Sequence, residues 1–325
     1  MTNIISKIKA TVKDALFKHQ LKRLYAADAK YQMRYLRGLA QESKDKSDAE
    51  IMLVMHALEK GMSFKVKKKG FGKEKSSALV DLLNKHLISY GVDDQVAVAT
   101  NILHGYLQDA FSVEDIDVRK KIEDYLSEHK DLLKESTGGA KSVTKPVNNL
   151  SYEDVLRLYS SRVSVREYSN QPLSKEEIDN AINLAQTSPS ACNRQAARVY
   201  VVKDEQLRRT IMDNQLGDQG WCNGADTLFV VTEKATYFGN LYERSEPFID
   251  GGMFAMNLVM GLHSQGIASC CKMYIREPHI DKTIRGLLSI PDNEIPIILI
   301  LAGHYPDHSV TSPISIKNSI NYEVQ

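Results

Sequence analysis

The sequence lacks the cysteine arrangements that crosslink secreted proteins or bind zinc. Its 325 residues include four cysteines, Cys192, Cys222, Cys270 and Cys271, and none of them form a Cys-x-x-Cys pair. Reduced thiols therefore fit this chain better than a disulfide framework or a zinc site. We expect Cys270 and Cys271 to be buried thiols rather than a redox pair.

Long hydrophobic runs are also missing. The longest, such as Ile295 to Ala302, are far shorter than a membrane span, and the N-terminus lacks the apolar core and small-residue cleavage site of a signal peptide. We therefore expect a cytoplasmic protein. No glycine-rich dinucleotide fingerprint is present, and no nucleophile lies in a recognisable pattern with a base. His56-x-x-Glu59 supplies only two metal ligands, so we expect no metal site.

Charge is unevenly divided along the chain. Residues 1–150 carry 26 Lys and Arg against 20 Asp and Glu, whereas residues 151–325 carry 16 against 21. The change coincides with a stretch rich in Gly, Ser, Thr, Pro and Asn, which is typical of a linker. The sequence thus predicts a helical N-terminal region over 1–134, a linker over 135–150 and a second domain over 151–325.

The N-terminal region has a helical period. Ile4, Ile8, Val12 and Leu16 recur every four residues, with lysines on the other sides. In the favoured interpretation, the lysines form the solvated face of a helix that packs on its neighbours. The alternative is that this basic helix contacts a membrane surface. Further helices are expected at about 47–61, 73–90, 94–110 and 114–134. The lysines at 65–69 have no interleaved aromatic residues, so we expect no binding to nucleic acid.

One helix end in this region carries titratable groups. His56, Glu59 and Lys60 lie within about one helical turn, and Gly61 is expected to end the helix. This corner would contact a substrate, or it is an ordinary helix end with a glycine cap. The sequence leaves the role of these residues and of the helical region open.

The second region alternates helices and strands around one sheet. Helices are expected from Ser151, from Ser174 with Glu177 completing a capping box, and over 204–214, 248–264 and 277–288. Strands are expected over 198–203, 227–232, 267–274 and 295–302. The pattern predicts an α+β or α/β domain with a central sheet.

Two short segments suggest a ligand. Ser188 to Gln195 is a small polar turn between a helix and a strand, against which a flat ligand could lie. About two dozen residues earlier, Arg162, Ser164 and Arg166 alternate two cations with a hydroxyl. This alternation suits an anionic phosphate or a ribityl chain.

These segments, in order, resemble the FMN-dependent nitroreductase family over residues 151–320. The resemblance rests on Arg162-x-Ser164-x-Arg166-x-Tyr168, Pro172, the Ser174 helix and the turn at 188–195. It continues through Gly224-Ala-Asp226, Asp250-Gly-Gly252, Gly266 to Ser269 and Ile290-Pro291. A softer match links the segment from His56 to Gly61 with an N-terminal extension of nitroreductase-like proteins found among polysaccharide-biosynthesis genes. The implied fold is α+β, with a central mixed sheet flanked by helices after an all-α region.

The resemblance implies a non-covalently bound FMN at the interface of a homodimer. NADH or NADPH would be the transient co-substrate, with a small-molecule acceptor following it. Arg162, Ser164 and Arg166 would bind the phosphate and ribityl chain, and Lys317 would be a C-terminal phosphate cation. Pro189, Ser190 and Ala191 would line the isoalloxazine, with Asn193 holding the loop or the ribityl chain.

The same resemblance implies that Cys271, Lys272 and Met273 bring backbone close to flavin N5. A partner for the pyrimidine edge would come from residues 214–223, with Asn214, Gln219 and Asn223 as alternatives. Trp221 is expected to pack or to form a pocket wall. No residue is assigned as a catalytic acid or base, because the flavin carries the chemistry.

The predicted function is NAD(P)H-dependent reduction of a nitroaromatic, quinone or other conjugated acceptor. Hydride transfer through flavin N5 would follow a ping-pong order. The alternatives are a family member with a divergent flavin reaction, and a binding or scaffold protein with a vestigial flavin site. The sequence does not identify the physiological acceptor or decide between NADH and NADPH.

Overall fold

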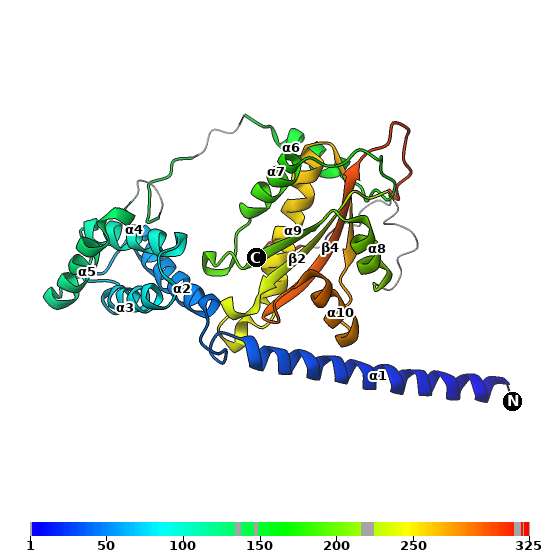
Figure 1. Ribbon diagram of the computed structural model, residues 1–325, viewed down its shortest axis with the longest axis horizontal. Coiled ribbons are helices and arrows are strands. Elements are labelled where there is room, and N and C mark those ends of the chain that lie inside the picture. Colours follow the sequence, from blue (N-terminus) through cyan, green and yellow to red (C-terminus); the bar gives the residue numbers. More distant parts are fainter. Residues whose placement is uncertain are drawn as a thin grey trace.

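The chain has a helical N-terminal region followed by a four-stranded sheet with helices around it (Figure 1). The computed structural model describes residues 2–133, 138–145, 149–215, 224–314, 320 and 322–324, with side chains given from residue 11 onward. The α-helices are α1 (Thr2–Tyr35), α2 (Lys44–Ser63), α3 (Lys73–Tyr90), α4 (Asp94–Gln108), α5 (Ile116–Glu128), α6 (Tyr152–Ser161), α7 (Lys175–Gln186), α8 (Glu205–Asp213), α9 (Glu246–Ser264) and α10 (Pro278–Leu288). The strands are β1 (Ala197–Val202), β2 (Thr227–Lys234), β3 (Ile267–Met273) and β4 (Glu294–His304). Short 3₁₀ turns are η1 (Lys130–Leu132), η2 (Ala191–Asn193), η3 (Ala235–Tyr237) and η4 (Leu241–Glu243).

Helix α1 extends away from the rest of the molecule in Figure 1. Residues 11–23 are exposed on every side. Closer to its C-terminal end the helix is held by ion pairs from Arg23 to Glu277 and from Asp28 to Arg276, at 3.1 and 3.0 Å. None of the helices that the structure describes combines the length and the apolar character needed to cross a membrane.

Helices α2 to α5 pack around a core of their own. Side chains cap their first turns, with Ser43, Asp93 and Asp115 accepting hydrogen bonds from backbone N–H groups of α2, α4 and α5. The buried cluster also takes in Tyr237 and Phe238, which follow β2. An ion pair between Asp45 and Lys234 joins α2 to the end of the same strand. The helical region is therefore packed directly against the β1–β2 side of the sheet.

The strand order is β1-β2-β4-β3, so β1 and β3 form the two edges. Alternate residues of β2 point to opposite faces, with Leu228 and Val230 in one buried cluster and Phe229 and Val231 in another. The first cluster includes residues of α8 and α10, and the second includes residues of α7 and α9. Helices thus cover both faces, which makes this part a three-layer arrangement.

The α+β class and the predicted helices and strands are confirmed. The capping box of Ser174 and Glu177 is present at the start of α7. The sheet differs from the mixed one expected, because every described pairing is antiparallel. The reason is the position of β4. Strands β2 and β3, which α9 connects, run in the same direction, but β4 lies between them in the opposite direction.

The expectation that α2 ends at Gly61 was wrong. The helix continues to Ser63 and ends before Phe64. A Cβ at residue 61 would lie 2.7 Å from the Phe71 ring. The glycine is therefore explained by close approach of an aromatic ring and not by a helix cap.

Two adjacent glycines within α9 give a matched test of how this helix packs on the sheet. A Cβ at Gly251 would lie 2.8 Å from Ile297 Cγ1 and 3.1 Å from Glu233 Cγ, whereas nothing lies within 4 Å of a Cβ at Gly252. We expect Gly251→Ala to lower the free energy of unfolding by about 1–3 kcal/mol through overpacking. Gly252→Ala should raise it by about 0.5–1 kcal/mol, because alanine favours a helix interior. Urea denaturation measures both, and equal effects would contradict the packing described.

Candidate functional site

The segment from Arg162 to Tyr168 runs beside the edge strand β3. The Val165 N–H donates to the Ser269 carbonyl at 3.0 Å, and the Tyr168 hydroxyl donates to the Val165 carbonyl at 2.7 Å. Val165 is fully buried, whereas Arg162, Ser164 and Arg166 are half-buried. The alternation noted in the sequence therefore places the three polar residues together, on the side of the segment away from Val165.

Three cations act on the pKa of the Cys270 thiol. Burial raises the pKa of this thiol, and the positive charges of Arg166, Lys272 and Arg162 act in the opposite direction. The structure thus brings Arg162 and Arg166, which were predicted together, close to Lys272 on β3. Cations concentrated at one sheet edge are suited to a ligand with a phosphate group.

The three residues predicted to lie near flavin N5 occupy both faces of β3. Lys272 is buried, and Cys271 and Met273 are exposed. The expectation of two buried thiols is thus confirmed for Cys270 and wrong for Cys271. The cause is strand alternation at a sheet edge, since consecutive side chains point to opposite faces.

The chain after β4 returns along the same edge. The Ser312 hydroxyl donates to the Ser164 carbonyl at 2.8 Å, and His308 pairs with Glu167 at 2.6 Å. Lys317, Gln219, Trp221 and Asn223 were named from the sequence and lie outside the described residues. Asn214, the third alternative for the flavin edge, ends α8 and donates to the Thr210 carbonyl at 2.8 Å.

The turn from Ser188 to Gln195 is fixed to α9 by two side chains. The Asn257 amide donates to the Ser188 hydroxyl at 2.8 Å, and Asp250 Oδ2 accepts from the Ala191 N–H at 2.9 Å. Both partners come from one face of a single helix. The helix therefore determines where the turn lies.

The same turn has a strained backbone. Cys192, Asn193 and Gln195 have φ angles of 53°, 52° and 51°, in the left-handed region that residues other than glycine seldom adopt. Such conformations persist where the surrounding contacts enforce them, and they cluster at functional sites. The contacts of the turn therefore fix the positions of the predicted site residues Pro189, Ser190, Ala191 and Asn193.

One chain holds the two predicted halves of the site at opposite edges of its sheet. Arg162 to Arg166 lies beside β3, and the turn at 188–195 leads into β1. Three strand spacings, about 14 Å, separate these edges. The structure does not bring the two sets of residues together within one chain.

Arg194 belongs to the turn but was not selected as a site residue by the sequence analysis, and its side chain is buried. Its guanidinium is fully buried, pairs with Glu243 at 3.0 Å and donates to the Tyr237 carbonyl at 2.9 Å. It also lies over the Phe238 ring, 4.8 Å from its centre. Burial acts to raise the pKa of Glu243, but the hydrogen bonds from Arg194 and the Gly239 N–H and the charge of Arg194 together lower it.

Two buried carboxyl groups lie close to Arg194. Burial and the neighbouring charge of Asp250 raise the pKa of Glu233 to about 9. Burial also raises the pKa of Asp250, although the Ala191 N–H acts against it. Glu233 is therefore protonated at neutral pH and can donate a hydrogen bond.

Glu233 carried a weak signal in the sequence, as a charged residue at the end of an apolar strand. Asp250 was noted only as part of a motif, and Arg194 only as part of the turn. The significance of all three depends on burial, which the local pattern does not give.

The residues of the His56 corner take different positions. Glu59 Oε2 lies 3.7 Å from His56 Nδ1, and Glu59 Oε1 accepts a hydrogen bond from the Gly139 N–H at 3.1 Å. Lys60 is exposed. Glu59 also lines a cavity that reaches the turn at 188–195.

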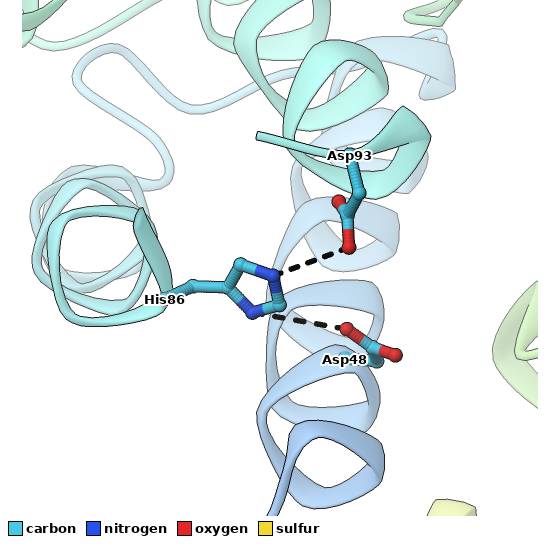
Figure 2. A group of neighbouring side chains, drawn as sticks. All are labelled: Asp48, His86 and Asp93. Carbon is cyan, nitrogen blue, oxygen red and sulfur yellow. Dashed lines mark hydrogen bonds and ion pairs between the residues drawn. The ribbon is translucent and has the colours of Figure 1, made fainter. Parts of the chain in front are cut away.

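A separate cluster in the helical region has the composition of a metal site. Figure 2 shows the His86 ring between Asp48 and Asp93, with ligand atoms within 4.8 Å of one another. The ammonium of Lys44 is bonded to Asp48 at 3.0 Å and to Asp93 at 2.5 Å, and Ser47 Oγ is bonded to His86 Nδ1 at 2.9 Å. Because a lysine already supplies the positive charge, this cluster serves to join α2, α3 and α4.

The raised pKa of Glu233 predicts a pH-dependent stability. A carboxyl that ionises at 4.5 when unfolded and at about 9 when folded costs stability as the pH rises between these values. We expect Glu233→Gln to be more stable than the native protein by on the order of 2–3 kcal/mol at pH 7, and by little near pH 4.5. Urea denaturation across pH 4.5–8 measures this difference. Glu176→Gln, at an exposed position on α7, is the control, and a gain independent of pH would contradict the assignment.

Comparisons with known proteins each match about half of the chain. A family model described as the nitroreductase family matches residues 159–219 and 211–304. An FMN reductase (NADPH) of Bacillus subtilis is 26% identical over 175 residues, which cover 49% of this chain and 69% of the relative. A second B. subtilis protein, an NAD(P)H-dependent FMN reductase, is 20% identical over 185 residues, covering 52% and 73%.

Among solved structures, a nitroreductase with bound FMN from Bacteroides fragilis matches with a TM-score of 0.43 and 17% identity. The match covers 53% of this chain and 99% of that chain. Residues 159–304 of this chain match the nitroreductase family model, and in this chain they follow a helical N-terminal region.

Proposed function

We propose that this protein is an FMN-dependent oxidoreductase that uses NAD(P)H to reduce a conjugated acceptor. The observation that carries the proposal is the group of cations at the β3 edge, where the segment from Arg162 to Arg166 is hydrogen-bonded to β3 and its two arginines act on the Cys270 thiol together with Lys272. The names of the relatives, FMN reductases and a nitroreductase with bound FMN, support the same cofactor and co-substrate.

The residues present offer partners for both the phosphate and the ring of FMN. Arg162 and Arg166 would bind the phosphate as bidentate donors, with Ser164 on the ribityl chain. Ser312 lies against Ser164, and Lys317 follows it by five residues as the further phosphate cation. The exposed face of β3, with Cys271 and Met273, would lie near the reactive edge of the ring.

Bound FMN supplies the redox chemistry, the transfer of a hydride from nicotinamide to acceptor. The protein positions the partners and excludes water. Pro189, Ser190 and Ala191 offer a surface of small side chains for a flat ring, and Asn193 fixes the end of the turn. Lys272, on the strand placed near the ring, would stabilise negative charge that develops on the ring during reduction.

The positions of the two half-sites support a homodimer. The cations and the turn at 188–195 lie at opposite edges of one sheet, so a two-fold pairing would place the turn of one chain beside the cations of its partner. Exposed apolar side chains are available for such a contact, including Tyr152, Leu156 and Tyr159 on α6 and Ile249 and Met256 on α9.

The phosphate assignment predicts loss of FMN from Arg162→Ala/Arg166→Ala. Each arginine contributes charge-assisted hydrogen bonds, so we expect the double variant to bind FMN at least about a hundredfold more weakly. Visible absorption of the purified protein, followed by anaerobic titration with NADH and NADPH, measures this. Lys175→Ala/Arg209→Ala removes two exposed cations from the same domain and is the control. Retention of FMN by the first variant, or a native protein that cannot be loaded with FMN, would overturn the proposal.

The shared site predicts complementation between two defective variants. Arg162→Ala/Arg166→Ala removes the cations, and Ser190→Trp blocks the turn. In a mixed dimer one site carries both defects and the other carries neither. Unfolding and refolding an equal mixture should therefore restore FMN to about one quarter of all sites. If the refolded mixture binds no more FMN than the two variants refolded apart, each site is formed by a single chain.

A further inference from the structure

A cavity of about 760 Å³ lies between the helical region and the turn at 188–195. Its helical wall includes Met52 and Met55 from α2 and Gln95 from α4. The opposite wall includes Pro189, Ser190 and Asn193. Its size is in the range that holds a small organic ligand, and such sites commonly lie between two packed units.

The cavity contains buried polar groups with unused hydrogen-bonding capacity. Arg194, Glu233 and Asp250 line it, and they are 0%, 1% and 3% exposed. Within the described part of the chain, Arg194 Nη2, Glu233 Oε2 and Asp250 Oδ1 have no hydrogen-bond partner. Unsatisfied buried groups are costly, so three of them at one cavity point to a ligand that bonds to them.

The other atoms of these side chains are already committed, which fixes what each can offer. Asp250 Oδ2 accepts the Ala191 N–H, so Oδ1 remains as an acceptor. Arg194 Nη1 and Nε bond to carbonyl oxygens, so Nη2 remains as a donor. Glu233 is a second donor at neutral pH because its pKa is raised to about 9. Together they match a ligand with a carbonyl oxygen beside an N–H group.

The walls of the cavity suit a flat ring. Met52 and Met55 face it from α2, and Val199 and Phe254 contribute further apolar surface. Methionine side chains adapt to irregular shapes and make favourable contacts with aromatic rings. The adjoining Pro189 and Ser190 belong to the proposed flavin surface, so a ring in this cavity would lie close to it.

We propose that this cavity binds a flat ring bearing a carboxamide, with the amide N–H on Asp250 and the carbonyl on Arg194 and Glu233. The helical region then forms one wall of the binding pocket and limits which rings enter. This inference rests on the proposed function. Two ligands share the chemistry, the nicotinamide of NAD(P)H and a carboxamide-bearing acceptor.

A pair of probes in which methyl groups replace the amide N–H hydrogens tests the cavity directly. The oxidised full-length protein is titrated with 4-nitrobenzamide and with N,N-dimethyl-4-nitrobenzamide, and dissociation constants are taken from ligand-observed NMR. We expect the primary amide to bind about tenfold more tightly, because only it can donate to Asp250. Equal affinities would overturn the proposal.

Two variants assign the contacts separately. Asp250→Asn places an amide where an acceptor is needed, so it should remove most of the tenfold preference. Asp213→Asn, at an exposed position on α8, is the matched control and should leave the preference intact. An unchanged preference in folded Asp250→Asn would overturn the proposal.

Glu233→Met tests the proposed carbonyl contact without changing Asp250, which holds the turn at 188–195. It removes the buried carboxyl while keeping its volume, so both probes should bind several-fold more weakly with their ratio preserved. Unaltered binding of both probes to this variant would overturn the carbonyl contact. Circular dichroism spectra establish that each variant is folded.

The two ligand sources are separated with FMN-loaded protein. NADH is compared with its 3-acetylpyridine analogue, which has a methyl ketone in place of the carboxamide. If Asp250→Asn slows reduction by NADH but not by the analogue, the cavity holds the nicotinamide; if both rates are unchanged, it holds the acceptor. The NMR titration requires no turnover, so a protein that bound the amides but no FMN would refute the proposed function and not the cavity assignment.

Discussion

The hydrogen bond from the Ala191 N–H to the carboxylate of Asp250 is the contact on which the rest of the site depends. It fixes the turn at 188–195 to α9, whose side chains also build the core beneath the sheet. The turn carries three residues other than glycine in the left-handed region, a conformation that needs such support. One oxygen of Asp250 positions the proposed flavin surface, and the other has no hydrogen-bond partner among the described residues, although the residue lines the cavity.

The sheet imposes a second constraint. Cations at the β3 edge and small residues before β1 are separated by the full width of four strands. If these residues form one FMN site as proposed, a single chain would need a large rearrangement of its core to close it, whereas a symmetric pair would close two sites at once. This argument for assembly comes from strand order alone.

The helical region extends the same site from the other side. Its core includes Tyr237 and Phe238 from the sheet domain, so it is packed against that domain as well as joined to it by a chain segment. The charged cluster of Lys44, Asp48, His86 and Asp93 holds its helices together. The methionines of α2 are thereby held over the cavity, where they can contact a ring without bonding to it.

The sequence alone determined the elements and the family. Apolar periods and capping residues such as Ser174 are local, and the helices and strands follow from them. The order of motifs from Arg162 to Pro291 pointed to the nitroreductase family for the same reason. The sequence also placed Arg162 and Arg166 on one side of one segment, because alternation is a property of an extended chain.

Tertiary structure alone decided how these pieces meet. Strand order put β4 between β2 and β3, which made the sheet antiparallel and placed the two half-sites at opposite edges. The position of Phe71 explains Gly61, and burial gives Glu233, Asp250 and Arg194 their chemical character. These properties depend on residues far apart in the chain. A local sequence pattern does not specify which distant groups will surround a side chain.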